Sequence, residues 1–354
     1  MNAESKKFLY KLLETPSPSG FEGRIQKIVK TRMQDYADQI RMDLHGNLIV
    51  GLNTKAPRSV MLAGHCDQIG FMVKHISELG YIYVESVGGI DKGVLPGSIV
   101  EIHAESGTIT GVFGRKPIHS QNAEDRQRML LDITRNWIDI GAKDRKEAER
   151  FVKIGDYVTF KPGVTELRND LISAPGIDNR VGLFVVMEAL RLCAKAKLNV
   201  ALYAVSTVQE EIGRRGAYTA TYSLNPEVGI AVDVTHASDN PGCEDPRATP
   251  ILLGKGPVIS RGPNTNPVVE KRLTDAAKAQ RTAYQVGPDP TPFGNDANSM
   301  QVTRGGVATA SVQIPQRYMH TQVEVCHLKD LENAARVIAQ FIKDIKPSTD
   351  FRPF

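Results

Sequence analysis

The chain has 354 residues, of which 41% are hydrophobic and 24% charged, an ordinary composition for a globular protein of one large domain or two. Its 44 basic and 40 acidic residues leave a net charge of +4, and no long basic run favours nucleic acid or a membrane surface as a partner. The start of the chain lacks the apolar segment of a signal peptide, and no stretch approaches the ~20 apolar residues of a membrane span. The four cysteines form no CxxC pair. We therefore expect a cytoplasmic protein with reduced thiols.

The first part of the chain predicts two helices followed by strands. Apolar residues recur at helical spacing over 3–14 and 21–36, and the turn-forming sequence TPSPSG separates the two segments. Two short strands follow, and then a third strand that is strongly apolar. This third strand runs directly into His65 and Asp67, so side chains that can bind ligands lie at its end.

Residues 71–164 have a different pattern from the rest of the chain. Short β-like runs alternate with glycine turns, a polar stretch covers 119–150, and a last strand is expected at 157–160. A short helix is expected at 142–151. The pattern predicts a small β-rich module inserted into a larger domain, and assembly of subunits is the first role that we expect for it.

After residue 164, helices and apolar strands alternate again. The expected elements are a helix at 181–196, a strand at 199–205, a strand at 227–234, a helix at 268–283, a strand at 308–314 and a helix at 328–345. Buried strands that alternate with helices are typical of α/β sheets. We expect the pocket for the substrate side chain to be lined by the loops at 238–267 and 285–300.

Polar residues gather where the apolar strands end. They are His65, Asp67, Asp178, Glu210, Glu211, Asp233 and His320. Each has an ordinary structural explanation when taken alone, such as a helix cap for Asp178 or a surface position for His320. Because ligands bind at the carboxyl ends of strands in open α/β sheets, the coincidence of so many such residues indicates one common site.

The chemistry of this set fits two divalent ions. Two imidazoles and several carboxylates form a nitrogen and oxygen ligand set that zinc, cobalt and manganese accept. A pair of ions needs a bridging carboxylate and further ligands for each ion, and one glutamate then remains as a general base for the attacking water. The His-x-Asp spacing fits a histidine ligand that is oriented by a neighbouring carboxylate.

The chain resembles the M42 family of dinuclear metallo-aminopeptidases, the glutamyl aminopeptidase and tetrahedral aminopeptidase group, nearly from end to end. The motifs that carry the resemblance are PSPSG at 16–20, GHCD at 64–67, GRKP at 114–117, IDIGA at 138–142, GIDNR at 176–180, VQEEIG at 208–213, RGA at 215–217, DVT at 233–235, GKGP at 254–257 and RYMH at 317–320.

The resemblance implies a role for each residue of the set. His65 and His320 match terminal metal ligands, one for each ion, and Asp178 matches the bridging carboxylate. The other two ligands implied are Glu211 and Asp233. The catalytic residues implied are Glu210 as general base and Asp67 as the partner of His65. The cofactors implied are two divalent ions per subunit, zinc or cobalt first and manganese as a possibility.

The resemblance also implies an architecture. We expect a mixed sheet flanked by helices, of the zinc-exopeptidase type, formed by residues 1–70 and 165–354. The module at 71–164 corresponds to the inserted dimerisation domain of the family, whose members assemble from dimers into hollow tetrahedral dodecamers. A cis peptide bond is implied between Asp178 and Asn179. Gln68 departs from the family, in which many members have Glu at this position, and we expect activity to survive the difference.

The function implied is a metal-dependent aminopeptidase that releases N-terminal residues from peptides with a free N-terminus, with no nucleic-acid or membrane partner. Three alternatives stay open. A deacylase acting on a non-peptide amide would use the same ligands. A glycosidase, of the endoglucanase type, needs only paired carboxylates and leaves His65 and His320 without a role. An assembly protein with a relict site does not explain why Glu210 is intact.

Overall fold

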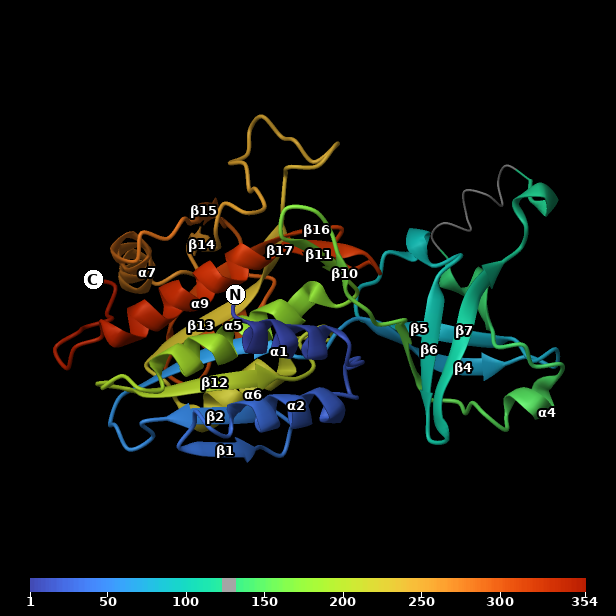
Figure 1. Ribbon diagram of the computed structural model, residues 1–354, viewed down its shortest axis with the longest axis horizontal. Coiled ribbons are helices and arrows are strands. Elements are labelled where there is room, and N and C mark those ends of the chain that lie inside the picture. Colours follow the sequence, from blue (N-terminus) through green and yellow to red (C-terminus); the bar gives the residue numbers. More distant parts are fainter. Residues whose placement is uncertain (123–131) are drawn as a thin grey trace.

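The computed structural model describes residues 1–122 and 132–354, so part of the predicted polar stretch at 119–150 lies outside the described residues. Its larger body is built on an eleven-stranded mixed sheet (Figure 1). The strands are β1 (Gln39–Met42), β2 (Leu48–Leu52), β3 (Ser59–His65), β10 (Thr165–Glu166), β11 (Leu171–Ala174), β12 (Ala201–Thr207), β13 (Val228–His236), β14 (Val258–Arg261), β15 (Gln285–Pro288), β16 (Ala308–Arg317) and β17 (Glu324–His327).

The strand order places four parallel strands at the centre of this sheet. The order is β1-β2-β12-β3-β13-β16-β17-β11-β10, and β14 pairs with β16 and β15 beside this path. The neighbours β12, β3, β13 and β16 are parallel, and β2, β14 and β17 are joined to them antiparallel. The carboxyl ends of the four central strands therefore meet at one edge of the sheet, where open α/β sheets bind ligands.

Helices cover both faces of the sheet. They are α1 (Ala3–Leu13), α2 (Gly23–Met33), α5 (Ile177–Cys193), α6 (Arg215–Leu224), α7 (Pro267–Ala279), α8 (Asp296–Gln301) and α9 (Leu328–Lys343). Val60 and Leu62 of β3 face a core shared with α1, α2, α5, α7 and α9, whereas Met61 and Ala63 face a smaller core with α6 and α8. This alternation follows from the two-residue period of a strand, and it confirms the predicted α/β class.

The second body is a closed six-stranded barrel, drawn beside the sheet in Figure 1. Its strands are β4 (Gly70–Ile76), β5 (Ile82–Val87), β6 (Ile99–Ala104), β7 (Gly107–Arg115), β8 (Asn136–Asp139) and β9 (Tyr157–Phe160), with helix α4 (Arg145–Ala148) and the short 3₁₀ helices η1 (Lys92–Val94), η2 (Ile118–Ser120) and η3 (Ile133–Arg135) between them. The barrel has a hydrophobic core of its own. The β-rich character expected for 71–164 is confirmed, while the exact domain limits stay a prediction.

Several predicted boundaries differ from the structure. Strand β13 runs on to His236, so Asp233 lies within a strand rather than at its end. Helix α5 begins at Ile177, although the backbone at Asp178 and Asn179 is not helical. The helix expected at 142–151 has only four residues. In the described part of the chain, no helix is both long and apolar enough to cross a membrane.

Candidate metal centre

The carboxyl-terminal edge of the sheet brings the predicted metal ligands together. His65 ends β3, and Glu210 and Glu211 follow β12 after a turn. Asp233 comes from β13, and Asp178 from the first turn of α5. The last member of the set, His320, follows β16. Parallel strands whose ends align bring residues that are far apart in sequence into one site, as the pattern predicted.

Asp178 lies between the two histidines. Its Oδ1 lies 3.3 Å from Nε2 of His65, and its Oδ2 lies 3.3 Å from Nε2 of His320. Among the described residues, the ligand atoms form two groups in which all atoms lie within 4.8 Å of one another: His65 with Asp178 and Asp233, and Asp178 with Glu211 and His320. The two groups share Asp178 alone, which is the arrangement that a bridging carboxylate requires.

The two neighbouring glutamates face different parts of the site. Oε2 of Glu210 lies 3.8 Å from Nε2 of His65, whereas Oε2 of Glu211 lies 3.7 Å from Nε2 of His320. The turn before them includes Gln209 with a positive φ of 57°. Oε1 of Glu211 is buried and has no hydrogen-bond partner among the described residues. A buried carboxylate oxygen without a partner is costly, and a cation would satisfy it.

Asp67 has a wider role than the orientation of His65. Its backbone carbonyl oxygen lies 3.1 Å from Nδ1 of His65, and its Oδ1 lies 3.5 Å from the same nitrogen. Its carboxylate also accepts the backbone N–H of Glu210 at 3.0 Å and that of Glu211 at 3.2 Å. Ser19 donates its hydroxyl to the carboxylate at 2.7 Å. Asp67 therefore holds the turn that carries both glutamates.

The carboxyl groups of the site are costly to ionise without positive charge nearby. Burial, reinforced by neighbouring carboxylates, raises the pKa of Glu210 to about 9 and that of Asp233 to about 7. Burial also raises the pKa of Glu211 well above its usual range. Burial acts in the same direction on Asp178, but hydrogen bonds to His320 and His65 hold its pKa well below the usual value. Divalent cations would supply the missing positive charge.

The residues fit the predicted ions. Each group offers one imidazole nitrogen and two carboxylates, a donor set that zinc, cobalt and manganese accept. Cys66 is buried beside the site, but it belongs to neither group. The cis peptide bond expected between Asp178 and Asn179 is confirmed.

Gln68, which departs from the family pattern, makes its hydrogen bonds in the described part of the chain with the N-terminal loop and not with the candidate ligands. It is buried, and its Oε1 accepts the backbone N–H of Ser17 at 3.3 Å. Its own backbone N–H donates to the carbonyl oxygen of Ser17 at 3.0 Å. Gln68 therefore joins the N-terminal loop to the end of β3, and its amide suits this role.

Neither Glu324 nor a loop of the barrel is predicted from the sequence to be part of the site, and Asp296, in a segment that resembles a family loop near the site, has no predicted role. Glu324 accepts hydrogen bonds from the backbone of Asp178 and His320. Asp296, which starts α8, accepts the hydroxyl of Thr207 at 2.6 Å. Gly89 lies against the ring of His320, so the barrel contributes backbone to the site. The adjacent glycines at 88–89 and the segment around Asp296 gave a sequence signal, but the contacts of the two carboxylates depend on the folded chain.

The site opens into a cleft of about 500 Å³. Besides the candidate ligands and Glu210, it is lined by Gly89, Gly213, Arg214, Val234, Thr235, His236, Gly294, Asn295, Gln313 and Met319. The expected loop at 285–300 contributes Gly294 and Asn295 to this cleft, whereas the described residues of 238–267 do not line it. Strand β13 continues past Asp233 and lines the cleft with Thr235 and His236. The loops that line the pocket for the substrate side chain stay a prediction.

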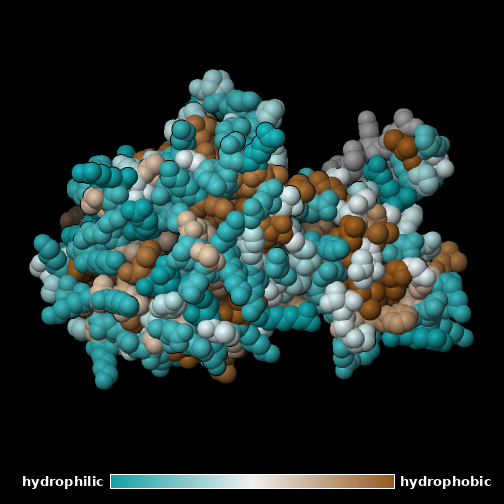
Figure 2. Space-filling model, in the orientation of Figure 1, coloured by the Kyte–Doolittle hydropathy of each residue, from teal (hydrophilic) through white to brown (hydrophobic). Residues whose placement is uncertain are grey.

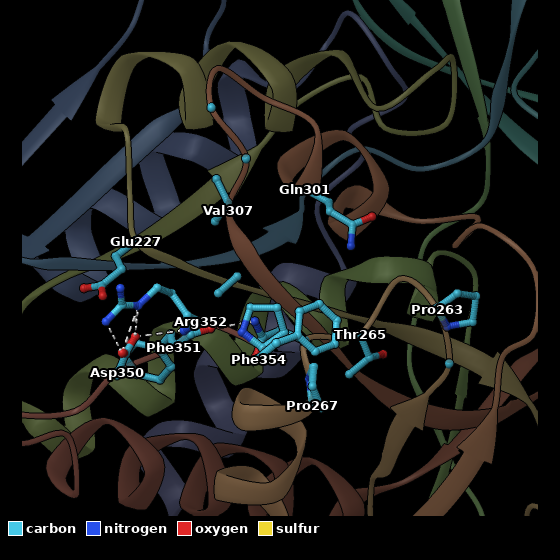
Figure 3. Close-up of a pocket in the computed structure, with 16 residues that line it drawn as sticks. Glu227, Pro263, Thr265, Pro267, Gln301, Val307, Asp350, Phe351, Arg352 and Phe354 are labelled. Carbon is cyan, nitrogen blue, oxygen red and sulfur yellow. Dashed lines mark hydrogen bonds and ion pairs between the residues drawn. The ribbon is translucent and has the colours of Figure 1, made fainter.

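A larger cavity of about 760 Å³ lies elsewhere, beside the C-terminal tail (Figure 3). Among its lining residues, Glu227 precedes β13 and Ala308 begins β16. The cavity therefore lies at the amino ends of these strands, whereas the candidate metal centre lies at their carboxyl ends. Its described lining includes no histidine or cysteine. The larger cavity is therefore separate from the candidate metal centre.

Comparison with known proteins gives consistent results. The sequence model of the family described as M42 glutamyl aminopeptidase matches residues 46–337. The lysyl aminopeptidase of Pyrococcus furiosus is 38% identical over 345 residues, which cover 97% of this chain and 98% of that protein. The crystal structure of a TET aminopeptidase from a marine sediment archaeon of the Thaumarchaeota has a TM-score of 0.92 and 30% identity, and the match covers 98% of both chains. The TET1 peptidase of Pyrococcus horikoshii has a TM-score of 0.84 and 29% identity, and the match covers 96% of this chain and 100% of that chain. That peptidase is described as able to assemble into a tetrahedron or a large octahedral shell.

Proposed function

The chain belongs to the M42 glutamyl aminopeptidase family, and from that premise we propose that it uses two divalent ions, with Glu210 as general base, to release N-terminal residues from peptides. As a member of this family the chain is an aminopeptidase. The observation that carries the two-ion proposal is the position of Asp178, whose two oxygens each lie 3.3 Å from a different histidine. Zinc or cobalt suits this donor set best, and manganese is also compatible with it.

The proposed ligands divide into two sets. His65 and Asp233 would hold one ion, Glu211 and His320 the other, and Asp178 would bridge them. When bound, the ions would supply a lower pKa for the attacking water and stabilisation of the negative charge that develops on the scissile carbonyl oxygen.

Glu210 is the group that moves the proton. Its side chain is 11% exposed and borders the cleft, and it belongs to neither ligand group among the described residues. It would take a proton from the attacking water and return it to the leaving amine. Asp67 would hold the backbone of Glu210, and so fix the position of the base.

The free N-terminus of the substrate suits the charge of this cleft. The carboxylates around the two histidines would attract the cationic α-amine, which would limit cleavage to the first residue. A glycosidase would leave the two histidines unused, although both lie against the central carboxylate.

We expect activity on aminoacyl-anilides after metal removal and re-addition, and none before re-addition. Acetylation of the substrate amine should slow hydrolysis by about 10- to 100-fold, the loss expected for one hydrogen bond to a charged group. The measurement is release of the aniline across a panel of side chains, each with its acetylated counterpart. Simple acyl-anilides cleaved as fast as the aminoacyl compounds would instead favour the deacylase alternative.

We also propose that the barrel mediates dimerisation and that dimers assemble further, in a cytoplasmic enzyme. Figure 2 shows hydrophobic residues gathered over the outer face of the barrel, where β6 and β7 lie in Figure 1. Ile99 of β6 and Val112 of β7 are cross-strand partners, and they are 46% and 47% exposed. Exposed apolar clusters of this kind are typical of protein interfaces.

Replacement of this apolar pair tests the proposed interface. The double variant Ile99→Asp, Val112→Asp should have a smaller mass in solution, because two charges buried at an interface without partners cost several kcal/mol. Light scattering after gel filtration measures the mass. Met42→Asp, at an exposed apolar position of β1, is the control and should keep the wild-type mass. A double variant that keeps the wild-type assembly would show that this face is not the interface.

A further inference from the structure

The loop that carries His320 has an unusual backbone conformation. Tyr318 and His320 have positive φ values of 60° and 63°, a region that residues other than glycine seldom adopt. Such conformations persist only where surrounding contacts hold them. The position of the His320 imidazole therefore depends on what holds this loop.

Glu324, the first residue of β17, contributes to the contacts that hold it, together with the Thr321 hydroxyl, which donates to the carbonyl oxygen of Tyr318. Its side chain is buried, with 0% of the residue exposed. Oε1 accepts the backbone N–H of His320 at 2.8 Å, and Oε2 accepts the backbone N–H of Asp178 at 3.0 Å. A single carboxylate therefore joins the backbone of one candidate ligand to that of the shared ligand.

We propose that Glu324 is a positioning residue of the metal centre, which holds His320 against Asp178 and so sets the affinity for the ion bound by Asp178, Glu211 and His320. The inference rests on the proposed two-ion site. Glu324 belongs to neither ligand group among the described residues, and both of its oxygens are already engaged with N–H groups. It acts through the backbone and not as a ligand.

The two halves of the site depend on Glu324 to different degrees. His65 and Asp233 are buried and lie within β3 and β13, which pair with each other in the sheet. Glu211 and His320 lie outside the strands, and the side chain of His320 is 33% exposed, although that of Glu211 is only 5% exposed. The half that contains His320 therefore has less support from the sheet and needs Glu324 more.

Replacement of Glu324 by glutamine tests this dependence. The amide has one acceptor oxygen and one NH₂ donor, so one of the two backbone N–H groups would lose its partner. Glutamine also removes a negative charge close to the cations. Outer partners of metal ligands typically change affinity by about 10- to 100-fold when mutated. We expect Glu324→Gln to weaken the ion of the His320 group by this factor, and to weaken the other ion less, because that ion shares only Asp178 with the contacts of Glu324.

The chain offers a matched control in Asp330. Its carboxylate is equally buried, at 0% exposed, and it also accepts two backbone N–H groups, from Gly254 at 2.7 Å and Gly256 at 2.8 Å. Neither glycine is a candidate ligand. Asp330→Asn should therefore lower thermal stability and leave the affinity for both ions unchanged.

The measurement is calorimetric titration of metal-free protein with Zn²⁺, for the wild type and both variants. The kcat of Glu324→Gln should recover at saturating Zn²⁺, which a merely structural defect would not do. The proposal would be overturned if folded Glu324→Gln bound both ions with wild-type affinity. It would also be overturned if Glu324→Gln and Asp330→Asn weakened the binding of both ions equally. The titration uses no substrate, so its result is independent of whether the protein cleaves peptides.

A second measurement on the wild-type protein covers the case in which Glu324→Gln does not fold. Hydrogen exchange of the metal-free protein should show slow exchange at the backbone N–H of His320, because Glu324 accepts its hydrogen bond without metal. Exchange at the rate of an unstructured segment would mean that Glu324 does not hold this loop, and would contradict the inference.

Discussion

Glu210→Gln should lower kcat by about 10²- to 10⁴-fold, the usual contribution of a general base, which corresponds to about 3–5 kcal/mol of activation free energy. Glutamine has nearly the shape of glutamate but cannot accept the proton of the attacking water. Since Glu210 belongs to neither ligand group, the variant should still bind two ions. The measurements are steady-state kinetics on an aminoacyl-anilide and metal analysis of the same sample.

The adjacent residue is the control for this variant. Glu211→Gln makes the same chemical change one residue along the chain, but Glu211 lies in the group with Asp178 and His320. We expect this variant to lose one ion, which Glu210→Gln keeps. Near-normal turnover of Glu210→Gln, or loss of the same ion in both variants, would show that the roles of the two glutamates are assigned wrongly.

Asp178→Asn should remove both ions and reduce activity to the level of the metal-stripped protein. Among the described residues, Asp178 alone is shared by the two ligand groups, so its replacement affects both at once. Asparagine has one oxygen in place of two and no charge. The loss should exceed the ~10- to 100-fold that is typical of outer partners, because a ligand itself is changed. Metal content after gel filtration gives the stoichiometry directly.

Asp233→Asn distinguishes the bridging role from that of an ordinary ligand. Asp233 belongs only to the group that contains His65, so its replacement should weaken one ion and leave the other. Thermal unfolding of the metal-free variants shows whether either change damages the fold itself. If Asp178→Asn lost only one ion, Asp178 would not be the bridging carboxylate.

The types of the elements and the identity of the candidate ligands could be predicted from the sequence. Apolar runs such as the one before His65 are local patterns, and a polar residue directly after such a run is visible without the fold. The α/β class follows from the same alternation, because a strand buried on both faces needs helices on both sides. The motifs around Asp178 and Glu210 then implied a role for each residue.

The support of the site could not be predicted, because it depends on contacts between distant segments. Nothing near Asp67 in the sequence indicates that its carboxylate holds the turn at Glu210. Asp233 lies inside β13 because pairing with β16 extends the strand beyond its most apolar part.

Glu324 is the clearest example of a supporting contact that could not be predicted from the sequence. In the sequence it is one acid among many, four residues after His320. Only the folded chain brings its two oxygens to the backbone of His320 and Asp178. The sequence by itself thus determined which side chains can bind metal, since that depends on their chemistry and on strand ends. The tertiary structure decided how they are held, since hydrogen bonds to the backbone exist only once distant strands and loops have come together.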